Sequence, residues 1–290
     1  MLASWYNRVS MNQLTTEKRA QVIRCLCEGM SIRATVRTTG AAKNTVVKLL
    51  AEIGRACADY QFETLRGLDS MVVQCDEIWS FVGCKERHAS AEKKAMGQGN
   101  AWTWTALDSD SKLIITWHLG GRSDDDAQDF MYDLADRLNK RIQLSTDGHG
   151  SYIKAVKLAF GKDVDYGQIV KVFGQDIYEE KRYSPAVCTS CQTKAIVGDP
   201  IESQISTSHV ERSNLTIRMQ NRRMTRLTNA FSKSIENHGH ALALTFMSYN
   251  FATPHGTLSK KAGMPTTPAM AAGVADHVWT MAEIVGLISN

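Results

Sequence analysis

The hydrophobic periodicity of this chain changes near residue 70, and this change restricts the fold class more than any other sequence feature. Before it, apolar residues recur every three to four positions, which is the spacing of an amphipathic helix. After it, short runs rich in β-branched and aromatic residues alternate with helical stretches. We therefore expect an all-α head followed by an α/β body, in which helices flank a mixed sheet.

The head has the pattern of a helix-turn-helix. Helical spacing predicts one helix from Thr15 to Gly29 and a short second helix after Ser31, and Gly40 permits the turn before a third helix near Ala42. The third helix of such a motif enters the major groove of DNA. Its outer face is expected to carry four polar residues: Lys43, Asn44, Thr45 and Lys48.

Charge favours DNA as the partner of this head. Residues 1–57 contain nine basic and three acidic side chains, so they carry +6, whereas the whole chain carries +4. Phosphate contacts supply most of the non-specific affinity for DNA, so a basic head suits that partner. The alternative is an ordinary three-helix bundle whose lysines are merely solvated.

Composition excludes several other classes of protein. With 43% hydrophobic residues, 22% charged residues and 5 prolines, the chain is neither disordered nor fibrous. It contains no apolar run near the ~18 residues of a membrane helix and no signal-peptide core. We expect a cytoplasmic, nucleoid-associated protein without a membrane partner. No phosphate-loop pattern is present, so no nucleotide cofactor is expected.

The 7 cysteines are expected to be reduced, because a chain of this length does not depend on disulfides. Cys188 and Cys191 alone have a metal-like spacing. A structural zinc site needs four ligands, and no second pair is present, so two loop cysteines are the simpler interpretation.

Acidic residues stand where the predicted sheet exposes the ends of its strands. Asp76 lies on the first strand, Asp147 follows the strand at 142–146, and Glu211 lies in the first turn of a helix that begins near Ser208. Ligands of open α/β sheets collect at such ends. Three convergent carboxylates suit Mg²⁺ or Mn²⁺, and two such ions ~4 Å apart promote phosphoryl transfer.

Two further acids compete for a place in this set. Glu77 is expected to point to the face opposite Asp76, because side chains alternate along a strand. Glu202 lies in a stretch without sustained periodicity, residues 174–207, which we interpret as an irregular insertion. Glu211 is favoured over both by the basic residues that follow it.

Those basic residues are arginines without a nearby counter-charge. No acid occurs between Glu211 and Glu236, and the interval contains Arg212, Arg218, Arg222, Arg223 and Arg226. Arginines beside a carboxylate site are expected to hold a DNA backbone. A solvated basic helix is the alternative.

Together these residues resemble the DDE transposases of bacterial insertion sequences, and among them the insertion-sequence-one family. The acids are separated by 71 and 64 positions, and an arginine stands seven residues past the glutamate. The segments that carry the resemblance are residues 75–82 (CDEIWSFV), 146–148 (TDG), 210–216 (VERSNLT) and 249–251 (YNF) with His255.

The resemblance implies an RNase H-like core that cuts and joins DNA at terminal inverted repeats. It implies two Mg²⁺ or Mn²⁺ ions held by Asp76, Asp147 and Glu211, with Arg218 near the scissile phosphate. Many relatives carry a small zinc-binding module before the helix-turn-helix, and this chain lacks the cysteines for it. Recognition of the ends is therefore expected to rest on the helix-turn-helix alone.

We expect three parts: a helix-turn-helix domain at 1–66, a catalytic domain at 67–255 and a tail at 256–290. Because two DNA ends must be joined, a homo-oligomer is expected. Two alternatives remain open, namely a nuclease of the same fold that does not join DNA and a catalytically inactive DNA-binding regulator.

Overall fold

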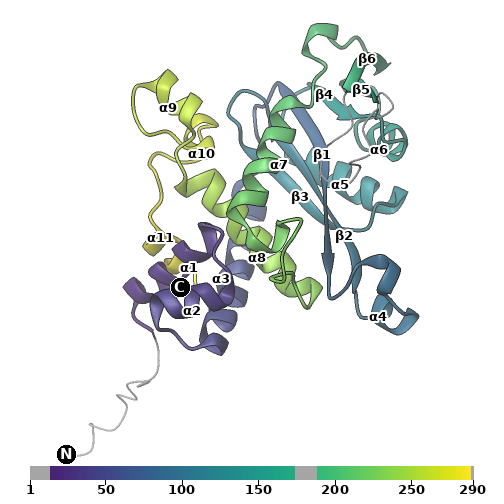
Figure 1. Cartoon of the computed structure of the whole chain (residues 1–290). Coiled ribbons are helices and arrows are strands. Elements are labelled where there is room, and N and C mark those ends of the chain that lie inside the picture. Colours follow the sequence, from purple (N-terminus) through teal and green to yellow (C-terminus); the bar gives the residue numbers. More distant parts are fainter. Residues whose placement is uncertain (1–13, 174–187, 289–290) are drawn as a thin grey trace, which may run out of the picture.

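A six-stranded mixed sheet forms the centre of the body, as the computed structural model shows for residues 14–173 and 188–288 (Figure 1). Its strand order is β3-β2-β1-β4-β5-β6. β1 pairs antiparallel with β2 and parallel with β4, and β6 closes the far edge antiparallel to β5. The strands are β1 (Val72–Val82), β2 (Gly99–Asp108), β3 (Ile114–Gly120), β4 (Ile142–Asp147), β5 (Val164–Phe173) and β6 (Cys188–Val197).

Helices cover both faces of this sheet, so the predicted α/β class is confirmed (Figure 1). α5 and α6 pack on one face, and α7 and α8 pack on the other. The body contains α4 (Ala91–Ala95), α5 (Asp124–Asp136), α6 (Ser151–Phe160), α7 (Ser208–Gln220) and α8 (Ile235–Met247). Single turns lie at Glu86–His88, Glu202–Gln204 and Arg222–Met224, and a π-helical turn, Ser248–Ala252, extends α8.

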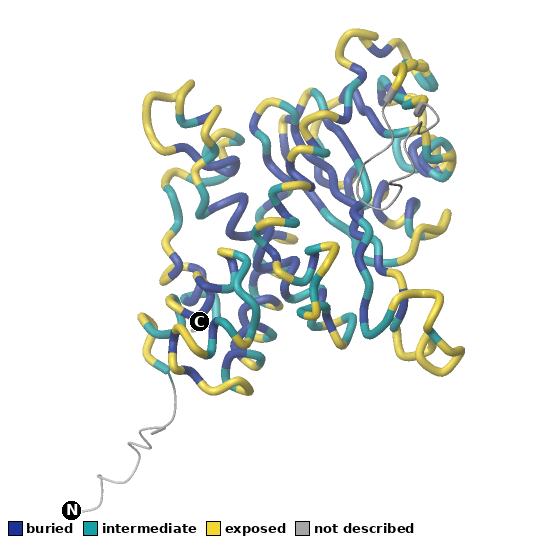
Figure 2. The backbone as a smooth tube through the Cα atoms, viewed as in Figure 1, coloured by how far each residue is buried: buried dark blue, intermediate teal, exposed yellow. Residues whose placement is uncertain are grey.

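The alternation of side chains along β1 builds two separate hydrophobic cores. Val73 and Cys75 are fully buried in the core that contains Phe130 of α5. Ile78 faces the other way and lies in the core with Val210 of α7. The central strands are therefore buried on both faces, whereas the peripheral turns around α4 are exposed (Figure 2). One strand thus determines the position of both helical layers.

Three helices form the head, as the periodicity predicts. They are α1 (Thr16–Cys27), α2 (Ile32–Thr39) and α3 (Lys43–Thr64). Thr15 and Ser31 cap the first two, and Gly40 ends α2 with φ of 72° in the left-handed region that favours glycine.

The head and the body share one hydrophobic core, because α3 continues well beyond the predicted DNA-reading turn and packs against α8. The backbones approach closely: a Cβ added at Gly54 would lie 2.5 Å from Cβ of His240. The Gln61 amide of α3 donates to the carbonyl of Ala243 in α8 at 3.1 Å. The domain boundaries at 66 and 255 stay predictions.

The predicted irregular insertion is wrong for part of its length. Residues 174–187 lie outside the described residues, but Cys188–Val197 form β6, and Cys191 pairs in register with Lys171 of β5. Cys188 and Cys191 therefore lie on a strand, not in a loop. The strand is stabilised by backbone pairing with its neighbour, which a weak local pattern does not reveal.

The C-terminal tail contains α9 (Gly256–Ala262), α10 (Pro268–Ala271) and α11 (Met281–Gly286). Thr280 caps α11, and α11 packs against α1. Among the described helices, none combines the length and apolar character needed to cross a membrane.

A buried histidine attaches the segment after α7 to the sheet. Nδ1 of His238 lies 2.7 Å from Oγ of Ser232, and its Nε2 lies 3.1 Å from Oγ of Ser80 on β1. Burial, and then the charge of Arg223, lowers the pKa of His238 to about 4. The imidazole is therefore neutral in the folded protein at pH 7.

Acidification should destabilise the protein through His238. The unfolded chain, in which a histidine pKa is about 6.5, takes up a proton as the pH falls below that value, whereas the folded chain does not until about pH 4. Stability is therefore present above pH 6.5 and lost towards pH 4, by roughly 3 kcal/mol. Urea unfolding across this range should show a smaller loss in His238→Gln. The exposed-site control His88→Gln should keep the wild-type slope, and an identical slope in both variants would contradict the assignment.

Candidate functional site

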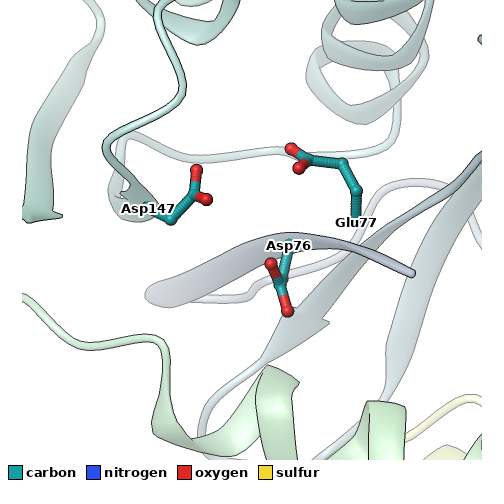
Figure 3. Close-up of side chains that lie close together, drawn as sticks. All are labelled: Asp76, Glu77 and Asp147. Atoms are coloured by element: carbon teal, nitrogen blue, oxygen red, sulfur yellow. The ribbon is translucent and has the colours of Figure 1, made fainter. Parts of the chain in front are cut away.

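The parallel register of β1 and β4 brings two of the predicted acids together. Val72 pairs with Gln143 and Gln74 with Ser145, so the same register continued by two residues places Asp76 beside Asp147. One carboxylate oxygen each from Asp76, Glu77 and Asp147 lies within 4.8 Å of the other two (Figure 3). We call these three residues the carboxylate cluster.

Glu77 belongs to this cluster although it leaves β1 on the face opposite Asp76, as predicted (Figure 3). Asp147 ends β4 and lies within reach of both faces of β1. Nη2 of Arg122 lies 3.0 Å from Oε2 of Glu77 and 3.9 Å from Oδ2 of Asp147. The Arg122 guanidinium also stacks over the Trp102 ring, 4.7 Å from its centroid. Sequence reasoning dismissed Glu77 and missed Arg122; the adjacent acids at 76 and 77 were the available signal.

The cluster carries more negative charge than its surroundings neutralise. Burial raises the pKa of Asp76 to about 7, and the charges of Glu77, Asp147 and Glu211 add to this increase. Burial likewise raises the pKa of Glu77. Three converging carboxylates, of which Glu77 has a buried side chain and the other two are partly exposed, match the ligand preference of Mg²⁺ and Mn²⁺, whose charge would relieve this repulsion.

Asp76 is oriented by α7, which lies across the sheet (Figure 1). Nδ2 of Asn214 donates to Oδ2 of Asp76 at 2.7 Å. The N-terminus of α7 is fixed by β1 itself, because Oε1 of Gln74 accepts hydrogen bonds from the backbone N–H groups of His209 and Val210 at 2.9 and 3.2 Å. The side chain of Thr207, at the N-cap position, makes no capping hydrogen bond, so Gln74 takes that role.

Glu211 lies on α7, like Asn214. Among the described residues it is not part of the carboxylate cluster. Its carboxylate is engaged by Nζ of Lys171 and by the hydroxyl of Thr207. Its charge still contributes to the raised pKa of Asp76. The structure thus brings Asp76 and Asp147 together and places Glu211 on the facing helix, bound to a lysine of β5.

The predicted arginines divide into two groups. Nη1 and Nη2 of Arg218 donate to the carbonyls of Met224 and Trp79 at 2.8 and 3.0 Å. Arg223 donates to Oγ of Ser232 and to a backbone carbonyl, both at 3.1 Å. Burial lowers the pKa of Arg218 and of Arg223 to about 10. Both side chains are bound to the protein, whereas Arg212 and Arg222 are exposed.

The predicted DNA-reading residues lie at the start of α3. Lys43, Asn44 and Lys48 are exposed and Thr45 is half-buried, while Val46 between them is buried in the core. Lys48 forms an ion pair with Glu52 one turn later at 3.7 Å. The polar face expected from the sequence is therefore present, and its contact with DNA stays a prediction.

Removing the charge of Glu77 should lower the pKa of Asp76. Glu77 is the largest charge effect on that carboxyl after burial, so Glu77→Gln leaves the Asp76 carboxylate less repelled. Carbon-detected NMR titration of the metal-free protein measures this pKa. Glu52→Gln, which removes a distant acid, should leave it unchanged. A pKa that stays near 7 in Glu77→Gln would show that the charge of Glu77 does not contribute to the increase.

Comparison with known proteins gives one weak relative. No family model matches the chain. The insertion element iso-IS1n protein InsB of Shigella dysenteriae is 24% identical over 169 residues, which cover 58% of this chain and 88% of that protein. The cryo-electron microscopy structure of the piggyBac transposase synaptic complex with hairpin DNA aligns with 98% of this chain and 73% of its own, at 11% identity and a TM-score of 0.39. The resemblance to insertion-sequence-one proteins that the motifs predict is thus confirmed over more than half of the chain.

Proposed function

We propose that this protein is a DDE-type transposase that binds the ends of an insertion sequence, cleaves DNA in a metal-dependent reaction and joins the freed 3′-hydroxyl to target DNA. The observation that carries the proposal is the convergence of Asp76, on β1, with Asp147, which ends the parallel neighbouring strand β4. The similarity to InsB and the helix-turn-helix at the N-terminus support it.

Asp76, Asp147 and Glu211 are proposed to hold the two divalent cations. Such ions lower the pKa of bound water and stabilise charge on attacking and leaving oxygens. The residues fit this role because they offer carboxylate oxygens, and because burial and the neighbouring negative charges raise the pKa of Asp76, an effect that a divalent cation would counter. Glu211 forms an ion pair with Lys171 of β5.

Glu77 is proposed as a positioning residue. Its side chain is 1% exposed and bonds to Arg122, which also lies near Asp147. The ion pair holds the guanidinium against the cluster. A specific observation favours a second assignment, in which Glu77 replaces Glu211 as the third ligand, since Glu77 and not Glu211 lies within the cluster.

DNA is proposed to contact the outer face of α3 through Lys43, Asn44, Thr45 and Lys48. Arg212 and Arg222 are proposed to contact the backbone nearer the cluster, because they are exposed. Arg218 and Arg223 were predicted as DNA contacts, and we now propose that they support the surface through their hydrogen bonds to the protein. Joining two ends requires a homo-oligomer.

Asp76→Asn, Asp147→Asn and Glu211→Gln should each abolish strand transfer in Mg²⁺ and Mn²⁺, because each loses an anionic oxygen ligand. The assay measures the joining of duplexes that carry the terminal inverted repeats to a target plasmid. Affinity for the same duplexes should stay within about twofold, because the phosphate-binding cations are retained. Cleavage without joining in the wild type would indicate a nuclease, and neither product would indicate an inactive regulator. Joining retained by Glu211→Gln but lost in Glu77→Gln would favour the second assignment.

Asn214→Ala should weaken Mn²⁺ binding and strand transfer by about 10- to 100-fold, which is the usual effect of removing a group that orients a metal ligand. Asn214 is the residue of α7 that bonds directly to Asp76. Calorimetric titration with Mn²⁺ measures the affinity. Thr216→Ala, two residues further along the same helix, serves as the matched control. Equal Mn²⁺ affinities in the two variants would show that Asn214 does not orient Asp76 for metal binding.

A further inference from the structure

We propose that a basic groove between the head and the segment 221–234 holds the backbone of duplex DNA and leads it from α3 to the carboxylate cluster. This inference rests on the proposed function and extends it to residues outside the DDE set. The groove has a volume of about 1250 Å³. Its walls come from the head, from the end of β1 and from the segment that follows α7.

The lining of the groove has a single sign of charge. It contains seven basic side chains and no acidic one. Arg223 is one of the seven and is bound to the protein, as described above. The other six are exposed: Arg33, Lys43, Lys85, Arg222, Arg226 and Lys233. Like charges concentrated on facing walls repel one another unless a polyanion lies between them, and a DNA backbone supplies such a charge.

Members of both predicted DNA-binding sets line this groove. Lys43 begins α3, the helix predicted to read the major groove, and Arg222 belongs to the arginines after Glu211. A helix-turn-helix binds duplex DNA, so the occupant is a duplex. The two sets, separated by almost 180 positions in the sequence, therefore face one partner.

The wall formed by residues 221–234 is firmly attached to the body. Nδ2 of Asn221 donates to Oγ1 of Thr245 on α8 at 3.1 Å. Ser232 accepts a hydrogen bond from Arg223 and lies beside His238, and its carbonyl accepts from the N–H of Gly83 at 2.8 Å. A wall fixed at both ends holds its charges in place, so less entropy is lost when DNA binds.

The separation between groove and cluster suits a short stretch of duplex. Phe81 in the groove lies five residues after Asp76 on the same strand, which corresponds to about 17 Å. Arg222 lies eleven residues after Glu211, which is outside the cluster but on the helix that bonds to Asp76, and the helical rise gives a similar length of about 17 Å. At about 3.4 Å per base pair, roughly five base pairs separate the groove from the cluster.

The aromatic residues of the groove argue against a single-stranded occupant. Phe81 and Phe231 pack against each other with ring centroids 4.8 Å apart. Nζ of Lys233 lies 3.3 Å from the centroid of Phe231 and covers that ring. Single-strand binding uses free aromatic faces on which bases stack, and this face of Phe231 is already occupied.

The test compares two triple variants of the full-length protein. Arg33→Gln, Lys85→Gln and Arg226→Gln together remove three groove charges from three different segments. Lys154→Gln, Lys157→Gln and Lys162→Gln remove three exposed charges on and just after α6. Fluorescence anisotropy measures the Kd for a 24-base-pair duplex of arbitrary sequence, without metal, from 50 to 200 mM NaCl. Circular dichroism confirms that both variants fold.

The groove variant should bind the duplex at least about 10-fold more weakly at 100 mM NaCl. The slope of the logarithm of its binding constant against the logarithm of the salt concentration should be smaller in magnitude by two to three, because each lost phosphate contact removes about 0.9. The α6 variant should change the slope by less than one. The groove proposal is wrong if both variants lose duplex affinity equally, or if the groove variant loses affinity only for single-stranded DNA of the same length. If only the groove variant loses duplex affinity, and the wild type joins no DNA strands, the groove is supported as a DNA-binding surface but the proposed transposase function is wrong. A wild type that binds no duplex rejects both.

Discussion

The parallel pairing of β1 with β4 is the constraint on which the site depends. It places Asp76 beside Asp147, the last residue of β4, at a position where burial penalises the charge of Asp76. Burial first, and then the charges of Glu77, Asp147 and Glu211, raise the pKa of Asp76 to about 7. The amide of Asn214 donates to the Asp76 carboxylate, and Arg122 lies near Asp147. Crowded like charges destabilise a folded protein, and such crowding is typical of functional sites. A divalent cation is the simplest ligand that would neutralise these carboxylates.

β1 connects this site to the two helical layers, to α7 and to the basic groove. Its alternate residues enter the two helical layers, its Gln74 fixes the start of α7, and its far end reaches the basic groove. The head is tied to the same frame, because α3 and α8 share a core and approach closely at Gly54. DNA held on the head would therefore have a defined position relative to the carboxylates, with no flexible linker between the two described parts.

Much of this arrangement could be predicted from local pattern. The capped helices of the head, the strand that contains Asp76, the strand that ends at Asp147 and the helix that carries Glu211 all follow from periodicity and capping residues. The opposite orientations of Asp76 and Glu77 follow from strand alternation (Figure 3). Their convergence with Asp147 did not follow, because alternation along one strand says nothing about how far a side chain on the neighbouring strand reaches. β6 was missed because its stability comes from pairing with β5.

The sequence by itself determined which segments are helices or strands, where acids stand at strand ends, and that the head is basic, since these depend on neighbours along the chain. Only the tertiary structure decided what each charge does. Arg218 and Arg222 are four residues apart in one basic run, yet the first is bound to backbone carbonyls and the second is exposed to a groove. Glu211 meets Lys171, 40 residues away, for the same reason. The role of a charged side chain is set by the groups that folding brings within hydrogen-bond distance, and local sequence contains no record of them.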